Sequence, residues 1–331
     1  VVFMKPWSFL RRLSGKLVLV LACAGASAQA QVAIVLNSRD ATVSLVDQKT
    51  LSEVGRVEVG KEPHHLYLKP DGKSLIVANA ISNDLHFLDP VSGQVQRRVR
   101  NIDDPYQIAF SPDNKWFVAV GLRLDRVDLY RYEGADLTLA RRVPVGKAPS
   151  HVWFSADSRF AFVTLQDSDE IGAIDLSTQT LAWKMKVGRQ PAGIVVTPDD
   201  RHLMVGIMGE GVVEVIDWQA QKTLRKIPTD TAAHNLHPRG DGRHYFVSNR
   251  SVSGGSISLL DTKTWTVVEK YDVPGGPDDM EVRADGKELW ATARFGRRVQ
   301  VIDLTTKQLK ISIPVGSSPH GVFFTGHAPR K

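Results

Sequence analysis

The chain has 331 residues, a formal net charge of +6 and a single cysteine, Cys23. The first thirty residues hold four basic residues, no acidic residue and that cysteine, so the remainder has a net charge of +2 and no thiol. For this remainder the composition excludes disulfides, c-type haem attachment, thiolate metal sites and a cysteine nucleophile, and it leaves nucleic-acid binding with little support.

Residues 1–30 have the pattern of a signal peptide. A basic start precedes an apolar stretch at residues 17–26, which is too short to span a bilayer, and residues 28–30 supply a small-x-small cleavage pattern. We therefore expect an exported, periplasmic protein that is not transmembrane and whose mature chain begins at Gln31. The alternative is a lipid-attachment site at Cys23.

From residue 31 onward the sequence repeats with a period of 42 to 44 residues. One column of the repeat is Asp47, Asp89, Arg131, Asp175, Asp217, Asp261 and Asp303. A second column follows about 16 residues later, at Pro63, Pro105, Pro149, Pro191, Ala233, Pro277 and Pro319. A turn of the Pro-Asp-Gly kind comes next in most repeats, as in residues 70–72. Such a period with turn residues at fixed offsets indicates a radial or solenoidal array.

One repeat predicts four short antiparallel strands, at residues 65–68, 74–79, 85–88 and 94–99. Seven such repeats, without helical patterning, predict an all-β fold: a seven-bladed β-propeller of four-stranded antiparallel blades.

The two ends of the repeat region complement each other. Residues 32–36, 41–46 and 53–59 predict three strands without an inner strand, and residues 320–324 predict one strand alone. We expect these N- and C-terminal strands to close the last blade, which leaves no open sheet edge. The propeller would then span residues 31–325, with 326–331 as a C-terminal tail, and we expect a monomer.

The repeated aspartates have a structural interpretation. An aspartate before a turn accepts hydrogen bonds from backbone donors two or three residues later. We therefore predict no catalytic role for this column.

One repeat combines Val59-Gly60-x-x-Pro63-His64, Pro70-Asp71-Gly72, Val77-Ala78-Asn79 and a strand ending at Asp89. This combination resembles the YVTN-type β-propeller repeat, and the likeness covers residues 32–325. The resemblance implies an exported propeller similar to the haem d1 domain of nitrite reductase and to d1-haem assembly propellers. It also implies a d1-type haem as one class of ligand, although the chain lacks the Cys-x-x-Cys-His electron-entry domain of the full reductase. The repeat itself is shared by proteins of unrelated role.

Strand direction places the proline column, and the loops between second and third strands, on one end of the propeller, which we call the top face. The residues that follow the proline column are His64-His65, Tyr106-Gln107, Ser150-His151, Ala192-Gly193, His234-Asn235, Asp278-Asp279 and His320-Gly321. Five of the ten histidines would thus meet at the inner rim. The arginines on the surrounding loops that we include in the predicted site are Arg39, Arg123, Arg250 and Arg294.

Imidazoles inside a ring of guanidiniums favour an anionic, partly flat ligand, because arginine pairs with carboxylates and histidine ligates metals. The predicted ligand-binding residues are His64, His65, Tyr106, His151, His234, Asp278 and His320, with the four arginines. The competing interpretation is structural, since a rim histidine can simply bond to a neighbouring loop. Of the pair Asp278 and Asp279, only one is expected to reach the rim, because adjacent strand residues point to opposite faces.

Two functions follow from this pattern. The first is a binding or scaffold propeller without catalysis of its own, which holds an anionic small molecule, a cofactor such as d1-type haem, or a periplasmic protein partner. In its haem version, one of the five histidines is the axial ligand. The alternative is a metal-dependent hydrolase of the lactonase type, which would need several converging carboxylate or amide ligands.

Overall fold

The computed structural model describes residues 1–3, 31–134 and 136–330. The predicted signal segment and the alternative lipid site at Cys23 fall in residues 4–30, outside the described part. Among the described residues, no helix is long and apolar enough to cross a membrane.

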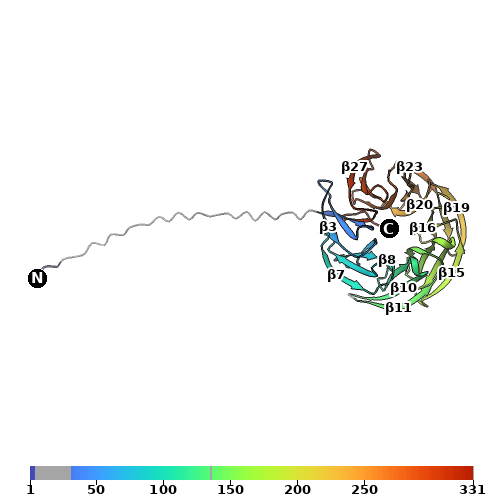
Figure 1. Ribbon diagram of the computed structural model, residues 1–331, viewed down its shortest axis with the longest axis horizontal. Coiled ribbons are helices and arrows are strands. Elements are labelled where there is room, and N and C mark those ends of the chain that lie inside the picture. The colour runs from blue at the N-terminus through green and yellow to red at the C-terminus, as the bar shows by residue number, and fades with distance from the viewer. Residues whose placement is uncertain (4–30, 135, 331) are drawn as a thin grey trace.

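The described chain forms seven four-stranded antiparallel sheets arranged around an axis (Figure 1), which confirms the predicted propeller. The strands nearest the axis are β4 (Pro63–Leu68), β8 (Pro105–Phe110), β12 (Pro149–Phe154), β16 (Pro191–Val196), β20 (Ala233–Pro238), β24 (Pro277–Val282) and β28 (Pro319–Phe323). Each inner strand contacts the inner strand of the next blade, so the ring is continuous.

The second and third strands of each blade lie between the inner strand and the outer strand. The second strands are β1 (Val32–Asn37), β5 (Leu75–Asn79), β9 (Trp116–Gly121), β13 (Phe160–Leu165), β17 (His202–Ile207), β21 (His244–Asn249) and β25 (Glu288–Ala293). The third strands are β2 (Thr42–Asp47), β6 (Asp84–Leu88), β10 (Arg126–Glu133), β14 (Glu170–Asp175), β18 (Val212–Asp217), β22 (Ser256–Asp261) and β26 (Arg298–Asp303).

The outer strands border solvent. They are β3 (Ser52–Glu58), β7 (Val95–Arg100), β11 (Asp136–Pro144), β15 (Thr180–Lys186), β19 (Lys222–Pro228), β23 (Thr266–Asp272) and β27 (Gln308–Pro314). Two single-turn 3₁₀ helices, Leu122–Leu124 and Gln166–Ser168, interrupt top-face loops.

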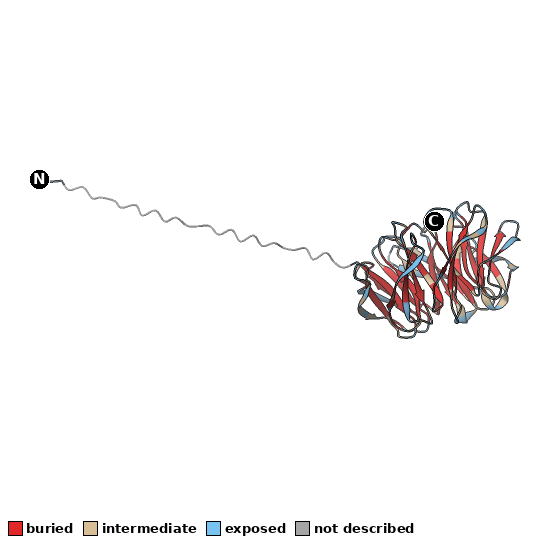
Figure 2. Ribbon diagram, turned by 90° about the horizontal axis from the view of Figure 1, so that it is seen from above, coloured by how far each residue is buried: buried red, intermediate tan, exposed pale blue. Residues whose placement is uncertain are grey.

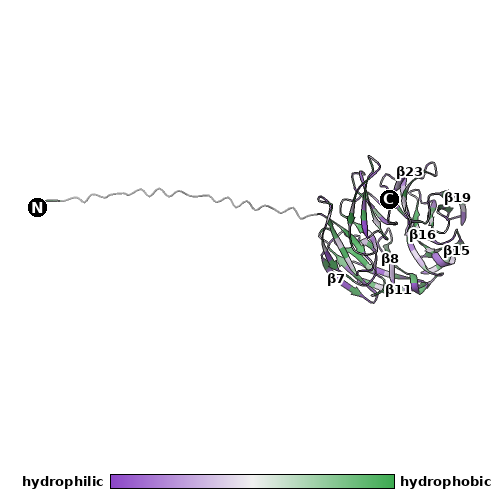
Figure 3. Ribbon diagram, turned by 45° about the horizontal axis from the view of Figure 1, so that its top comes forward, coloured by the Kyte–Doolittle hydropathy of each residue, from purple (hydrophilic) through white to green (hydrophobic). Residues whose placement is uncertain are grey.

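Burial follows from this arrangement. Second strands such as β5 and β9 are buried at every position because both faces pack against neighbouring blades. Outer strands such as β15 alternate between exposed and half-buried residues. Figure 2 shows buried segments within the blades and exposed segments at the outside of the propeller, and Figure 3 shows both hydrophilic and hydrophobic segments on the outer strands. The core therefore consists of clusters between blades.

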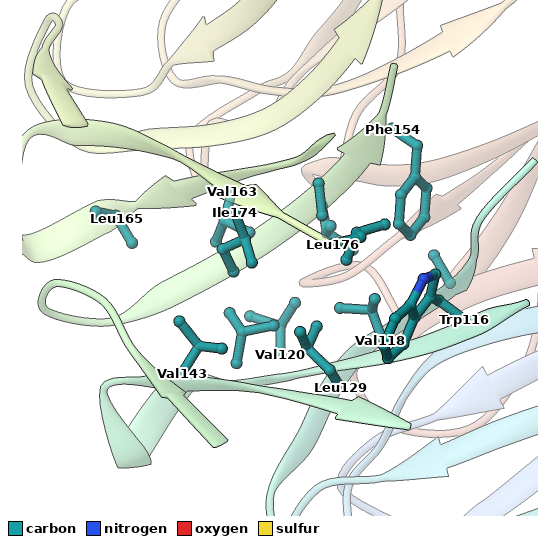
Figure 4. Close-up of a cluster of buried hydrophobic side chains, with 14 residues drawn as sticks. Trp116, Val118, Val120, Leu129, Val143, Phe154, Val163, Leu165, Ile174 and Leu176 are labelled. Atoms are coloured by element: carbon teal, nitrogen blue, oxygen red, sulfur yellow. The ribbon is translucent and has the colours of Figure 1, made fainter. Parts of the chain in front are cut away.

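Figure 4 shows one of these clusters, which joins the third and fourth blades in chain order. Trp116, Val118 and Val120 on β9 face Phe154 on β12 and Val163 on β13. Neither blade could bury this surface alone, as expected for a repeat array.

The closing blade combines the two ends of the propeller, as predicted. Its strand order is β28-β1-β2-β3, and β28 pairs with β1 through Ile34 opposite Phe323 and Val35 opposite Val322.

The aspartate column has the predicted structural role. Each of the six aspartates accepts a hydrogen bond from a backbone N–H two or three residues later in the turn. In the repeat without the acid, the guanidinium of Arg131 lies 3.7 Å from the ring centre of Trp116 instead.

Candidate functional site

The start of every inner strand is built in the same way. The residue before the proline column has a left-handed backbone, with φ between 42° and 71°, at Glu62, Asp104, Ala148, Gln190, Ala232, Gly276 and Ser318. Directly afterwards, the pairing of inner and second strands shifts register in all seven blades. Such bulges re-aim side chains at a strand end.

The bulges gather side chains from five blades at the axis. His64 and His65 are adjacent on β4, yet both rings reach the same cluster, which strict alternation along a strand would not allow. We call the set His64, His65, Tyr106, His151, His234 and His320 the imidazole cluster.

The rings of the imidazole cluster are in contact. The ring centres of His64 lie 3.7 Å from His320 and 3.8 Å from Tyr106. His151 links the two sides, since its ring centre lies 5.2 Å from that of His65 and 5.4 Å from that of His234. All five histidines are at most 4% exposed. The cluster therefore fills the channel instead of lining an open funnel.

Hydroxyl groups on the second strands support the bulges. Thr164, Ser248 and Thr292 accept hydrogen bonds from the backbone N–H of His151, Asn235 and Asp279, respectively. Ser248 and Thr292 also donate to the carbonyl of the next blade's rim residue, Asp278 and His320. Sequence reasoning missed these hydroxyls, although each occupies the last-but-one position of its strand.

Asp278 is the charged centre beside the imidazole cluster. Its carboxylate is fully buried and lies 2.9 Å from Nδ1 of His234 and 3.5 Å from Nε2 of His320. Arg250 and Arg294 also contact it, through Nη1 atoms at 3.2 and 2.9 Å. Two guanidiniums thus share one carboxylate.

Burial decides the protonation of the cluster. It lowers the pKa of His65 and of His234 to about 4, and it lowers the pKa of His64 and His320 well below the usual range. For Asp278, burial alone would raise the pKa, but the interactions with His320, Arg250 and His234 lower it well below its ordinary value. Because the histidines are neutral near pH 7, the guanidiniums are the cations that hold Asp278 ionised, and the site has a surplus of positive charge.

Several ring nitrogens of the cluster have no hydrogen-bond partner. They include Nε2 of His65, Nε2 of His151 and both ring nitrogens of His320. One nitrogen from each of His64, His65 and His320 lies within 4.8 Å of the others, a spacing that could hold a metal ion. Two surface cavities, of about 400 and 190 Å³, lie elsewhere, against Asp104 and Arg123 and against Asp199 and Trp265.

The structure does not bring all predicted residues together. Arg39 is exposed, and Arg123 bonds to Glu62 and Asp104 at the larger surface cavity. The arginines that reach the cluster and those that do not differ in how far they follow the end of the second strand. Arg250 and Arg294 directly follow the second strands β21 and β25, whereas Arg39 and Arg123 come two residues after β1 and β9, farther along the loop.

Only one residue of the acidic pair joins the cluster, as expected. Asp279 instead accepts a hydrogen bond from Asn235, and burial raises its pKa to about 6. Near it, fully buried Glu281 contacts His237 and Arg330. The side chain of Arg330 thus belongs to a second polar layer, which sequence reasoning did not identify.

Known proteins resemble the chain at two levels. The family model of the YNCE-like beta-propeller matches residues 14–330. Protein NirF of Stutzerimonas stutzeri is 32% identical over 92 residues, a region that is 27% of this chain and only 23% of NirF.

Solved structures share the fold. A protein of unknown function from Desulfotomaculum acetoxidans has a TM-score of 0.75 at 13% identity, over 89% of this chain and 98% of its own. The dihydro-heme d1 dehydrogenase NirN, in complex with DHE, has a TM-score of 0.63 at 20% identity, over 86% of this chain and 64% of its own. A putative 6-phosphogluconolactonase from Bacteroides fragilis has a TM-score of 0.72 at 15% identity, over 91% of this chain and 99% of its own. At these identities the likeness concerns the fold alone.

Proposed function

The chain belongs to the YNCE-like beta-propeller family, and on that premise we propose that it is an exported, periplasmic binding propeller without catalysis of its own. It holds an anionic ligand above the imidazole cluster, at Arg250 and Arg294. The signal-peptide pattern in residues 1–30 supports export.

The observation that carries the proposal is the surplus of positive charge at Asp278. Both arginines contact this one carboxylate, and the neighbouring imidazoles are neutral near pH 7. A partly buried cation that lacks a full counter-charge is costly, and an incoming carboxylate or phosphate would relieve that cost. The side chains of Arg250 and Arg294 are 20% and 22% exposed, so both can reach a ligand in solvent.

A d1-type haem is the finer version of this proposal. The donors fit such a ligand, because imidazole nitrogens without partners suit haem iron and guanidiniums suit the carboxylates of a tetrapyrrole. The space within the cluster does not fit a macrocycle, since the rings of His64, His320 and Tyr106 already touch. We therefore propose that a haem would lie across the top of the cluster, with its carboxylates on the arginines.

The donor set favours binding over lactone hydrolysis. A metal-dependent hydrolase of that kind needs several carboxylate or amide ligands. In the described cluster, Asp278 supplies the carboxylate, and both of its oxygens already contact arginines.

A haem titration of the purified full chain tests the proposal. We expect a Soret shift with the wild type, and a dissociation constant about ten- to a hundredfold larger for Arg250→Gln or Arg294→Gln, since each change removes one charge-assisted contact. Arg123→Gln is the matched control, because Arg123 lies on the same face but outside the cluster. Equal loss in all three variants would contradict the anion site. No Soret shift, and no change on substitution of the five histidines by alanine, would remove the haem version.

A further inference from the structure

We propose that His64, His65 and His320 form a binding site for a divalent first-row transition-metal ion of the zinc or copper class. The three imidazoles come from neighbouring inner strands, β4 and β28, and all are buried. This site goes beyond the anion site, because it uses no arginine and needs no anionic ligand to form.

The unpaired nitrogens give the first argument. Both ring nitrogens of His320, and Nε2 of His65, are buried without a hydrogen-bond partner. Buried polar atoms in folded proteins almost always have a partner, so an unpaired group calls for an explanation. A metal ion bound to Nε2 of His65 and to one ring nitrogen of His320 would supply a partner for each of these two atoms.

The spacing gives the second argument. One nitrogen from each of the three rings lies within 4.8 Å of the others. Zinc–imidazole bonds are about 2.0–2.1 Å long, so small ring rotations would bring three nitrogens into a common coordination sphere. An ion would need only this small spacing between ligand atoms, whereas a larger ligand would have to separate rings that already touch.

The chemistry of the donors selects the metal. Three neutral imidazoles favour zinc, copper or nickel over magnesium and calcium, which prefer oxygen ligands.

Asp278 lies 3.5 Å from Nε2 of His320, so a buried carboxylate borders the metal trio. Three protein ligands leave a fourth position open for water or an anion.

Calorimetric titration of the full chain with Zn²⁺ alone, after treatment with a chelator, tests this site. We expect one ion per chain and an affinity reduced by at least about a hundredfold in His65→Gln and in His320→Gln. His86→Gln is the matched control, because this buried histidine lies on β6, in the same blade as His64 and His65 but outside the imidazole cluster, and its affinity should equal that of the wild type. Thermal unfolding of each variant reports whether it is folded.

Co²⁺ replaces Zn²⁺ in a second measurement that needs no variant. The wild type should show the strong visible absorption of a four-coordinate, nitrogen-ligated cobalt ion. Absence of Zn²⁺ binding by the wild type, or an equal loss in His86→Gln, would overturn the metal site. Either result leaves the anion site standing, since the haem titration of Arg250→Gln and Arg294→Gln tests that site separately.

Discussion

At the scale of single residues, the site depends on how burial divides charge among neighbouring groups. The imidazoles lose their protons because they are buried, whereas Asp278 keeps its charge because Arg250 and Arg294 contact it. The imidazole cluster is therefore neutral, and the two guanidiniums beside it are cationic. The guanidiniums favour an anionic ligand, and the neutral imidazoles are suitable ligands for a metal ion.

The same protonation makes the stability of the protein depend on pH. We expect the free energy of unfolding to decrease as the pH falls from about 6.5 towards 4. Burial lowers the pKa of His65 and His234 from 6.5 to about 4, so the unfolded chain takes up protons that the folded chain cannot. Each neutral ring contributes its full share to the free energy of unfolding above the unfolded pKa of 6.5. That share, on the order of 3 kcal/mol for each ring, is lost as the pH falls towards the folded pKa of about 4.

Asp279 should increase the free energy of unfolding as the pH falls, because burial raises its pKa to about 6. We expect the five histidines to outweigh this single carboxyl group. Urea unfolding at about pH 7.5 and about pH 4.5 measures the net effect. His151→Gln should flatten the profile, because burial lowers the pKa of His151 well below its usual value. Equal stability at the two pH values would contradict the buried neutral cluster.

The residues of the site were predictable only in part. The histidines follow the proline column, so the period of the sequence was enough to bring them together. Whether an arginine reaches the cluster depends on how many residues it follows the end of its second strand. Arg250 is the first residue after β21 and reaches Asp278, whereas Arg123 is the second residue after β9 and does not. Arg250 reaches Asp278 from the preceding blade, whereas Arg294 belongs to the same blade as Asp278, and no spacing in the sequence encodes that both arginines meet this one carboxylate.

At the scale of elements, the starts of the inner strands position most of the side chains of the site. Strand bounds were predicted to within about two residues, because turn residues recur at fixed offsets; β5, for example, spans Leu75–Asn79 against the predicted 74–79. The bulges were not predicted, since they depend on pairing between strands and on the left-handed residue before each proline. They explain why His64 and His65 reach the same cluster.

The closing strand β28 offers a test at this scale. Deletion of residues 315–331 should prevent formation of a compact monomer, because β1 would lose its partner and Ile34 and Val35 would be exposed. Size-exclusion chromatography and thermal unfolding measure this. A truncated chain with unchanged thermal unfolding would refute the closure.

The control for this deletion removes only residues 326–331. It keeps β28 and should give a folded monomer of lower stability, since buried Glu281 loses its contact with Arg330.

At the scale of the whole molecule, the ring arrangement turns weak local signals into one site. Six of the seven blades contribute one or two polar side chains, and the closed ring places them at a common axis (Figure 1). The described C-terminal end also lies near this axis, where Arg330 contacts Glu281 in a separate polar layer. The propeller fold therefore brings polar side chains from distant parts of the chain into one site.

The most direct measurement of the central claim is native mass spectrometry, with an absorption spectrum, of the protein purified without denaturation from the periplasm. We predict that the wild type and Arg123→Gln carry the same anionic species, and that a double variant, Arg250→Gln with Arg294→Gln, has lost it. A species retained equally by the double variant would contradict the assignment of the binding site to these two arginines.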